Sequence, residues 1–270
     1  MPDNPIKIMY LNPVAEDPVV DQIFADMARD HKLPGTEVHV TALPKEHYAF
    51  SHIEFRTYEG MVTRGILRAV RAAAEEGFDA LAIGCFYDTG LHDAREISGD
   101  MIVTGPCVAA CEIAASLSNR FGIIVGRRKW VHQMQSTVQS YGHGERLVGF
   151  YDVGLGVDDF QKDHAETNRR LLAAGRKAVE DGAESLILGC TMEIGFYREI
   201  ERELGVPVID PSIAALKRAE YAAILKRQAG WVPSRKGSCE APPERELAAF
   251  DVFGGDVPVF GSRIVVGAGS

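Results

Sequence analysis

Short runs of apolar residues recur along the chain and predict buried strands. They are rich in Ile, Val and Leu, and they begin at Ile6 (IKIMYL), Ala80 (ALAIG), Phe121 (FGIIVG), Ser185 (SLILG) and Val206 (VPVID). Runs with so few polar residues are typical of parallel strands that are covered on both faces.

Alanine- and charge-rich segments with helical periodicity lie between these runs. In residues 61–77, Ile66, Val70 and Ala74 fall on one helical face, and residues 168–182 have a similar spacing. Each segment ends at a glycine that suits a helix C-terminus. The alternation of strands and helices predicts an α/β fold with parallel sheets and right-handed crossovers.

One phrase of the sequence occurs twice. FDALAIGC ends at Cys85 and AESLILGC ends at Cys190, and the Pro-initiated segments PCVAA and PSIAA, from Pro106 and Pro211, keep the same separation as the two cysteines. An internal duplication explains this match. It predicts two pseudo-symmetric lobes with parallel sheets, each with a cysteine at the carboxyl end of a strand, where such sheets bind their ligands.

The predicted boundaries follow from this duplication. Residues 1–104 with 211–229 form a first lobe that carries Cys85, and residues 105–210 form a second lobe that carries Cys190. Residues 230–270 are rich in Gly, Pro and Ser and form a C-terminal extension. This extension is expected to be a short hairpin, an oligomer contact or a partly disordered tail.

Composition narrows the class of function. The formal charge of -9 and the pI of about 5.4 argue against nucleic-acid binding, because no dense Lys/Arg face is available for phosphates. The sequence has no apolar run long enough to span a membrane and no secretory leader, so we expect a cytoplasmic protein without a membrane partner. Five cysteines without a Cys-x-x-Cys pair predict neither a disulfide framework nor a zinc site, and no metal is expected.

The two repeated cysteines suggest a specific chemistry. A cysteine between a buried strand and the start of a helix is close to backbone N–H groups, and these favour the thiolate. Inversion of an acidic carbon centre needs a base on one face and an acid on the other, which a thiolate and a thiol supply without a cofactor. Cys107 and Cys111 lie in an apolar helical stretch and are expected in the core.

The segments around both cysteines resemble a known family. GCFYDTGLHDAREI from Gly84, LILGCTMEIGF from Leu186 and the following VPVIDPSIAALKRAE are similar to the aspartate/glutamate racemase superfamily, and within it to the hydantoin racemase branch. The resemblance extends to about Ala229. It implies an active site in a cleft between two lobes, a small-molecule substrate, no pyridoxal phosphate or other cofactor, and a homo-oligomer.

The resemblance also implies roles for individual residues. Cys85 and Cys190 match the two acid/base cysteines. The expected substrate-binding residues flank them or follow the first strand: Asn12 and Pro13 in the loop after that strand, Phe86, Asp88 and Thr89 after the first cysteine, and Gly189 and Thr191 beside the second. Glu193 either holds a hydrogen bond near Cys190 or only complements a helix dipole.

The predicted function is a cofactor-independent racemase acting on a 5-substituted hydantoin or a related cyclic amide. Other reactions of the superfamily remain as alternatives: maleate-type cis–trans isomerisation, amino-acid racemisation and decarboxylation. A binding protein without catalytic activity is a further alternative. The sequence departs from amino-acid racemases at Asn12-Pro13-Val14 and at Phe86-Tyr87, which disfavours free aspartate or glutamate as the substrate. It departs from its relatives again at Gly126-Arg127-Arg128-Lys129, where either the anion contact is made differently or the substrate differs from theirs.

Overall fold

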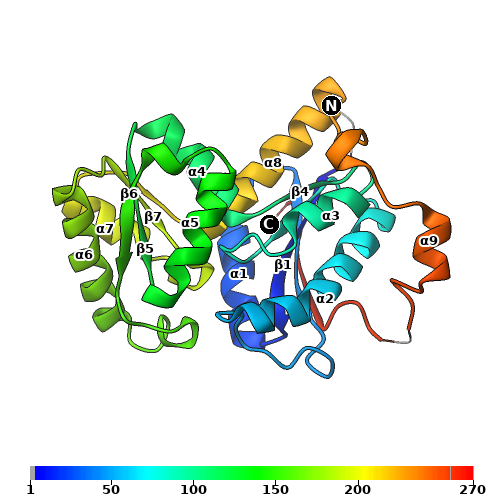
Figure 1. The fold of residues 1–270 in the computed structure, drawn as a ribbon, viewed down its shortest axis with the longest axis horizontal. Coiled ribbons are helices and arrows are strands. Elements are labelled where there is room, and N and C mark those ends of the chain that lie inside the picture. The colour runs from blue at the N-terminus through cyan, green and yellow to red at the C-terminus, as the bar shows by residue number, and fades with distance from the viewer. Residues whose placement is uncertain (1–3, 256, 270) are drawn as a thin grey trace. The chain divides into compact units, whose positions relative to one another are not determined.

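The computed structural model describes residues 4–255 and 257–269, which form two compact units (Figure 1). The first comprises Met1–Ile83, Thr89–Thr104 and Leu216–Ser270, and the second comprises Gly84–Asp88 and Gly105–Ala215. The structure therefore groups the segment around Cys85 with the second unit, whereas the sequence places it in the first lobe. It also groups the C-terminal extension with the first unit.

The first unit is built around a five-stranded sheet of order β4-β3-β1-β2-β9. Its strands are β1 (Ile6–Ala15), β2 (Thr36–Leu43), β3 (Ala80–Ile83), β4 (Ile102–Thr104) and β9 (Ser262–Val266), all parallel except β9, which pairs antiparallel with β2. Helix α1 (Pro18–His31) lies against β2 and β9, and α2 (Arg56–Glu75) and α3 (Leu91–Ile97) lie against β1, β3 and β4 (Figure 1).

The second unit is built around a four-stranded parallel sheet of order β6-β5-β7-β8. Its strands are β5 (Phe121–Val125), β6 (Leu147–Asp152), β7 (Ser185–Leu188) and β8 (Val208–Ile209). Helices α4 (Pro106–Leu117) and α5 (Val131–Ser140) lie on one face, and α6 (His164–Glu180) and α7 (Tyr197–Leu204) lie on the other (Figure 1). Helix α8 (Pro211–Ala229) follows β8.

The two sheets have the same internal order. Reading from the edge, β4-β3-β1-β2 of the first sheet corresponds to β8-β7-β5-β6 of the second, with strands of each set in the same sequence order. The duplicated phrase therefore falls on corresponding strands, β3 and β7. The predicted α/β fold with parallel sheets is confirmed, with β9 as the one antiparallel addition among the described strands.

The glycines at the ends of the two predicted helices behave as expected. Gly77 follows α2 with a φ of 78°, and Gly182 follows α6 with a φ of 99°, which are left-handed conformations that glycine adopts without strain. In both turns the next residue reaches back to the helix, with Phe78 N–H donating to the Ala73 carbonyl and Ala183 N–H to that of Ala178. This bonding closes the helix and turns the chain into the following strand.

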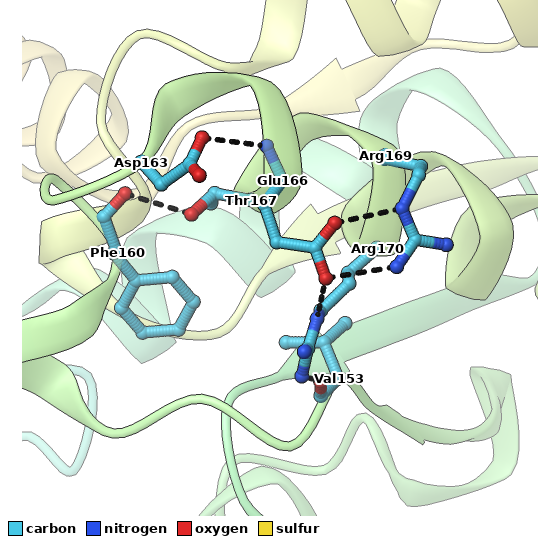
Figure 2. Close-up of polar contacts among 7 residues, drawn as sticks. All are labelled: Val153, Phe160, Asp163, Glu166, Thr167, Arg169 and Arg170. Atoms are coloured by element: carbon cyan, nitrogen blue, oxygen red, sulfur yellow. Dashed lines mark hydrogen bonds and ion pairs between the residues drawn. The ribbon is translucent and has the colours of Figure 1, made fainter.

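Side chains fix the start of α6 (Figure 2). Asp163 accepts the N–H of Glu166, and the Thr167 hydroxyl donates to the carbonyl of Phe160. The Glu166 carboxylate in turn receives hydrogen bonds from the guanidinium groups of Arg169 and Arg170, which lower its pKa to about 2. The helix thus begins with a side-chain cap and a carboxylate in its first turn, as the helix dipole favours.

The C-terminal extension forms ordered structure in the first unit. Helix α9 (Glu244–Ala249) is joined to α2 by the ion pair between Arg71 and Glu244, at 2.6 Å. Arg263 of β9 pairs with Glu76 at 2.6 Å. The extension therefore supplies an edge strand to the first sheet; a contact with a neighbouring subunit stays a prediction.

Two general features of the described residues complete the fold. None of the helices in residues 4–255 and 257–269 is long and apolar enough to cross a membrane. Within the same residues, no group of three or more His, Cys, Asp or Glu side chains has an arrangement that could hold a metal ion.

Candidate active site

Both repeated cysteines lie directly after a central strand of a sheet. Gly84 and Cys85 follow β3, and Gly189 and Cys190 follow β7. Cys85 is half-buried and Cys190 is 8% exposed, and neither forms a disulfide bond. Although their strands belong to different sheets, both cysteines belong to the second unit.

The chain makes the same turn after each cysteine. The N–H of Asp88 donates to the carbonyl of Cys85 at 2.9 Å, and the N–H of Glu193 donates to the carbonyl of Cys190 at 3.0 Å. Each cysteine is thus the first residue of a tight turn whose fourth residue is acidic. The duplication therefore extends from the sheet order to the local backbone of the site.

Asp88 anchors the first turn to the start of α4. Its carboxylate accepts the N–H groups of Cys107 and Val108 and the hydroxyl of Tyr141, each at 2.9 Å. Asp88 has a φ of 53°, a left-handed conformation that Asp tolerates better than most residues. Because these donors occupy both carboxylate oxygens, Asp88 holds the Cys85 turn in place, and its expected contact with substrate stays a prediction.

Gly105 leaves the space that this anchor needs. A Cβ atom at Gly105 would lie 2.6 Å from the Asp88 carboxyl carbon, too close for any side chain without movement of Asp88. The glycine before α4 therefore permits the close approach of Asp88 to the helix N-terminus.

Glu193 and Cys190 cap each other in the second turn. Cys190 precedes the short 3-10 helix η4 (Thr191–Glu193), and its carbonyl accepts the N–H of Glu193 at 3.0 Å. The Glu193 carboxyl accepts the N–H of Cys190 at 3.2 Å. Burial raises the pKa of Glu193 well above its usual range.

Asp210 fixes the segment beside the second turn. Its carboxyl accepts the N–H groups of Gly195, Ser212 and Ile213 at 3.1, 2.9 and 3.3 Å, which caps the start of α8. Burial raises the pKa of Asp210 to about 6, in spite of these donors. The sequence analysis did not identify this residue, although Asp followed by Pro is a typical helix start.

Thr191 joins the two cysteine turns. Its hydroxyl donates to the carbonyl of Gly84 at 3.1 Å, and its own carbonyl accepts the hydroxyl of Ser212 at 3.2 Å. The residue after Cys190 thus contacts the residue before Cys85. The expected contact of the Thr191 N–H and hydroxyl with a substrate oxygen stays a prediction.

Two further predicted binding residues also serve the local structure. The N–H of Gly189 donates to the carbonyl of Ile124 at 2.7 Å, and a Cβ atom at Gly189 would lie 2.6 Å from that oxygen. Phe86 is 2% exposed and packs in the core of the second unit. Contacts of Gly189 and Phe86 with a substrate stay predictions.

The remaining predicted binding residues belong to the first unit. The expectation that Asn12 and Pro13 lie in a loop is wrong, because β1 continues to Ala15 with a register shift after Asn12. That irregularity accommodates a proline, which has no N–H to donate to a neighbouring strand. Asn12 is buried. The hydroxyl of Thr89, the last of these residues, donates a hydrogen bond to the Glu59 carboxylate at 3.0 Å.

The cysteines expected in the core are buried there. Cys107 and Cys111 are both 0% exposed on α4. A hydrogen bond with Cys111 and burial raise the pKa of Cys107 well above its usual range, so it stays a thiol at neutral pH. These two residues are therefore distinct from the thiols of the cysteine turns.

Comparisons with known proteins agree with this architecture. Residues 8–219 match the model of the Asp/Glu/Hydantoin racemase family. The chain is 34% identical over 246 residues to the hydantoin racemase of Paenarthrobacter aurescens, covering 89% of this chain and 99% of that protein. It is 33% identical over 192 residues to the hydantoin racemase of Pseudomonas sp. (strain NS671), covering 70% and 75% of the two chains.

A solved structure gives the same result. The allantoin racemase from Klebsiella pneumoniae superposes with a TM-score of 0.79 and 26% identity, covering 88% of this chain and 94% of that one. The chain belongs to the Asp/Glu/Hydantoin racemase family. The predicted superfamily, its hydantoin racemase branch and the enzyme class, an isomerase of the racemase type, are thereby confirmed.

Proposed function

We propose that this chain racemises a 5-substituted hydantoin or a related cyclic amide, with Cys85 and Cys190 as its two acid/base groups and without a cofactor. The observation that carries the proposal is the repeated strand-Gly-Cys sequence, whose two cysteine turns lie in the second unit and are joined by the hydrogen bond from Thr191 to Gly84. The hydantoin racemase relative that aligns over 99% of its length supports the substrate class. Allantoin, a hydantoin with a ureido group at C5, belongs to the same class.

The reaction needs two proton transfers on opposite faces of one carbon. One cysteine thiolate removes the C5 proton, and the electron pair of the C–H bond moves into the neighbouring carbonyl to form an enolate. The thiol of the other cysteine then donates its proton to the opposite face of C5, and the electron pair returns. The reaction ends with the two cysteines in exchanged protonation states, so each enantiomer is converted by the enzyme form that the other one leaves.

The two cysteine environments differ in a way that suits this exchange. Cys190 is nearly buried, whereas Cys85 is half-buried. A thiolate that is shielded from water is a stronger base than one in bulk solvent, because burial disfavours its charged form. The buried pair Cys107 and Cys111 has no part in the reaction.

The test follows deuterium and optical rotation together. Enantiopure 5-substituted hydantoins, allantoin among them, are incubated with the native protein and with the Cys85→Ser and Cys190→Ser variants in deuterated water. Native protein should lose optical rotation while deuterium enters at C5. Each variant should lose racemisation and keep exchange for at most one enantiomer. Cys239→Ser, which changes an exposed thiol, is the matched control and should behave as native.

Other outcomes distinguish the alternatives. Racemisation that persists in both variants would contradict the two-thiol mechanism. Absence of exchange with every hydantoin, together with turnover of maleate or of a free amino acid, would replace the substrate class while leaving the family unchanged.

A further inference from the structure

Asp21 is a buried carboxyl group in the first turn of α1 that no step of the proposed reaction uses. It is 1% exposed, and its Oδ2 accepts the hydroxyl of Ser262 at 2.6 Å. Ser262 begins β9, so this hydrogen bond joins α1 to the C-terminal extension. A buried carboxyl is costly unless both of its oxygens have partners, and burial raises the pKa of Asp21 in spite of this donor.

Three paired strands place Asn12 and Ser262 in one row of the first sheet. Asn12 of β1 pairs with Ala42 of β2, and Ala42 pairs with Ser262 of β9. Residues that are opposite each other on paired strands direct their side chains to the same face of the sheet. Because neighbouring strands are about 4.8 Å apart, Asn12 and Ser262 are separated by about 10 Å, with one alanine between them. A carboxyl group above this small residue can reach both side chains.

Helix α1 covers this row. The rings of Phe24 and Tyr10 stack with centroids 5.2 Å apart, and Tyr10 shares a face of β1 with Asn12. Asp21 precedes Phe24 by three residues, so the two lie on one face of the helix. Since α1 connects two parallel strands, it runs opposite to β1, and the step from Phe24 back to Asp21 follows the step from Tyr10 to Asn12. Asp21 therefore lies near Asn12 as well as Ser262.

Asn12 and Asp21 each have an unused polar atom. The Asn12 side chain is close enough to lower the pKa of Asp21, against the larger effect of burial. The Asn12 Nδ2, a donor, and the Asp21 Oδ1, an acceptor, are both buried without a hydrogen-bond partner among the described residues. An unpaired donor or acceptor is costly inside a protein. A rotation of the Asn12 amide that pairs these two atoms is therefore favourable.

The backbone alone does not fix Asn12. The pairing of β1 with β2 shifts directly after this residue, and Pro13 has no N–H to donate to a neighbouring strand. Leu11 pairs with Ile83, the last residue of β3, so Asn12 lies at the carboxyl end of the sheet, where parallel sheets bind their ligands. A side chain that contacts a ligand from such a position needs a fixed partner to keep one orientation.

We propose that Asp21 is a positioning residue that fixes the side-chain amide of Asn12 for substrate, and that Ser262 of the C-terminal extension holds Asp21 in place. The proposal rests on the proposed function, because the contact of Asn12 with substrate belongs to it. With its Nδ2 on Asp21, the Asn12 amide presents its oxygen as an acceptor, and a hydantoin ring carries two N–H groups that can donate to it. The extension thereby acts on substrate binding as well as on the edge of the sheet.

Steady-state kinetics with a hydantoin substrate compare four variants. Asp21→Asn keeps the size of the side chain but no longer presents two acceptors. Ser262→Ala removes the donor on Asp21, and Ser262→Thr keeps it. Arg263→Gln is the matched control, because it changes the next residue of β9, whose ion pair is with Glu76. Circular dichroism checks the fold of each variant.

We expect the effect to appear in KM. Asp21→Asn should raise KM by about tenfold and Ser262→Ala by about threefold, with smaller changes in kcat, because substrate loses an oriented acceptor. Ser262→Thr and Arg263→Gln should keep the native KM. A merely structural role would instead lower the apparent kcat at native KM, because partial unfolding only removes active enzyme, and that result would overturn the proposal.

A double-mutant cycle tests whether Asp21 acts through Asn12. Asn12→Ala should lower kcat/KM, and the addition of Asp21→Asn should lower it no further, because the amide that Asp21 holds is already absent. Losses that multiply as independent effects would contradict the proposal. Native kinetics in Asn12→Ala would contradict it as well, while leaving the two-cysteine reaction intact.

A second measurement needs no substrate. The chain has four asparagines, at positions 4, 12, 119 and 168, so nitrogen labelling of asparagine side chains gives four amide signals in an NMR spectrum, and Asn12→Ala identifies one of them. Ser262→Ala should shift the Asn12 signal, and Arg263→Gln should not. An unshifted signal in a folded Ser262→Ala variant would refute the arrangement. A shifted signal in a protein that turns over no hydantoin would refute the proposed function and leave the arrangement of Asp21 standing.

Discussion

The hydroxyl of Thr191 donates a hydrogen bond to the carbonyl of Gly84 at 3.1 Å. These residues are neighbours of the two cysteines, one after Cys190 and one before Cys85. A single contact between a side chain and the backbone thus connects two turns that are far apart in sequence. It fixes one cysteine turn relative to the other within the second unit.

Replacing this hydroxyl tests that connection. Thr191→Val keeps the shape but leaves the Gly84 carbonyl without the donor, so we expect the free energy of unfolding to fall by about 1–3 kcal/mol. We also expect kcat to fall more than KM rises, because the turns lose their alignment. Urea denaturation and steady-state kinetics measure both effects. Thr191→Ser, which retains the donor, should stay close to native in kcat; equal losses in both variants would refute the connection.

The space at Gly105 gives a second prediction. Gly105→Ala pushes a methyl group against the Asp88 carboxyl, so the cap on α4 and the Cys85 turn must shift. We expect a loss of about 1–3 kcal/mol in the free energy of unfolding, and faster alkylation of Cys107 as the start of α4 loosens. Gly60→Ala is the matched control, because a Cβ there meets nothing within 4 Å and Gly60 lies inside α2. That variant should be neutral or more stable.

We expect the protonation of Asp210 to make the free energy of unfolding depend on pH. Its pKa is raised from 3.8 to about 6 in the folded protein, so between these values the folded state keeps a proton that the unfolded state loses. Stability contributed by this group is therefore present below about pH 4 and falls as the pH rises towards 6. The total decrease in the free energy of unfolding over this pH range amounts to about 3 kcal/mol.

The measurement compares native protein with Asp210→Asn by chemical denaturation at several pH values. The native protein should lose stability relative to the variant between pH 4 and pH 6, and the difference should be constant above that range. A parallel pH profile of the two proteins would show that Asp210 does not titrate in this window.

Removal of the extension tests its structural role. A chain that ends at Gly230 loses β9 and exposes the backbone edge of β2, so we expect a lower melting temperature and faster aggregation, measured by calorimetry and light scattering. Arg263→Gln removes a partly exposed ion pair with Glu76 and a cation–π contact with Phe260, and it should cost about 1 kcal/mol, much less than the truncation. A truncated chain that melts as the native protein does would mean that β9 contributes nothing to the sheet.

The sequence predicts the central strands well because each is a short run with few polar residues. It does not identify β2, in which Glu37, His39 and Thr41 interrupt the apolar residues, although His39 packs edge-on against Phe78. The pairing of β9 with β2 was also beyond prediction. The local pattern of apolar and polar residues indicates that a segment forms a strand, but it does not indicate which distant strand that segment will pair with.

The candidate site also has residues that the sequence predicts and residues whose role depends on the fold. Repetition identifies Cys85 and Cys190 because two copies of one phrase need a common cause. It cannot show that Asp88 and Thr191 direct their polar atoms to backbone groups, since that depends on which loops meet in space. Asp210 gave a local signal, Asp before Pro, but its proximity to the Cys190 turn arises only when β8 pairs with β7.

The pairing of β9 with β2 has a consequence for biosynthesis. Apart from Gly84–Asp88, the second unit consists of one continuous stretch, Gly105–Ala215, that leaves the ribosome before the extension is made. The first sheet, in contrast, begins with β1 and receives its last strand only when Ser262–Val266 has emerged. The edge of β2 therefore stays open to other chains until β9 has been made, and only the emergence of that strand protects it.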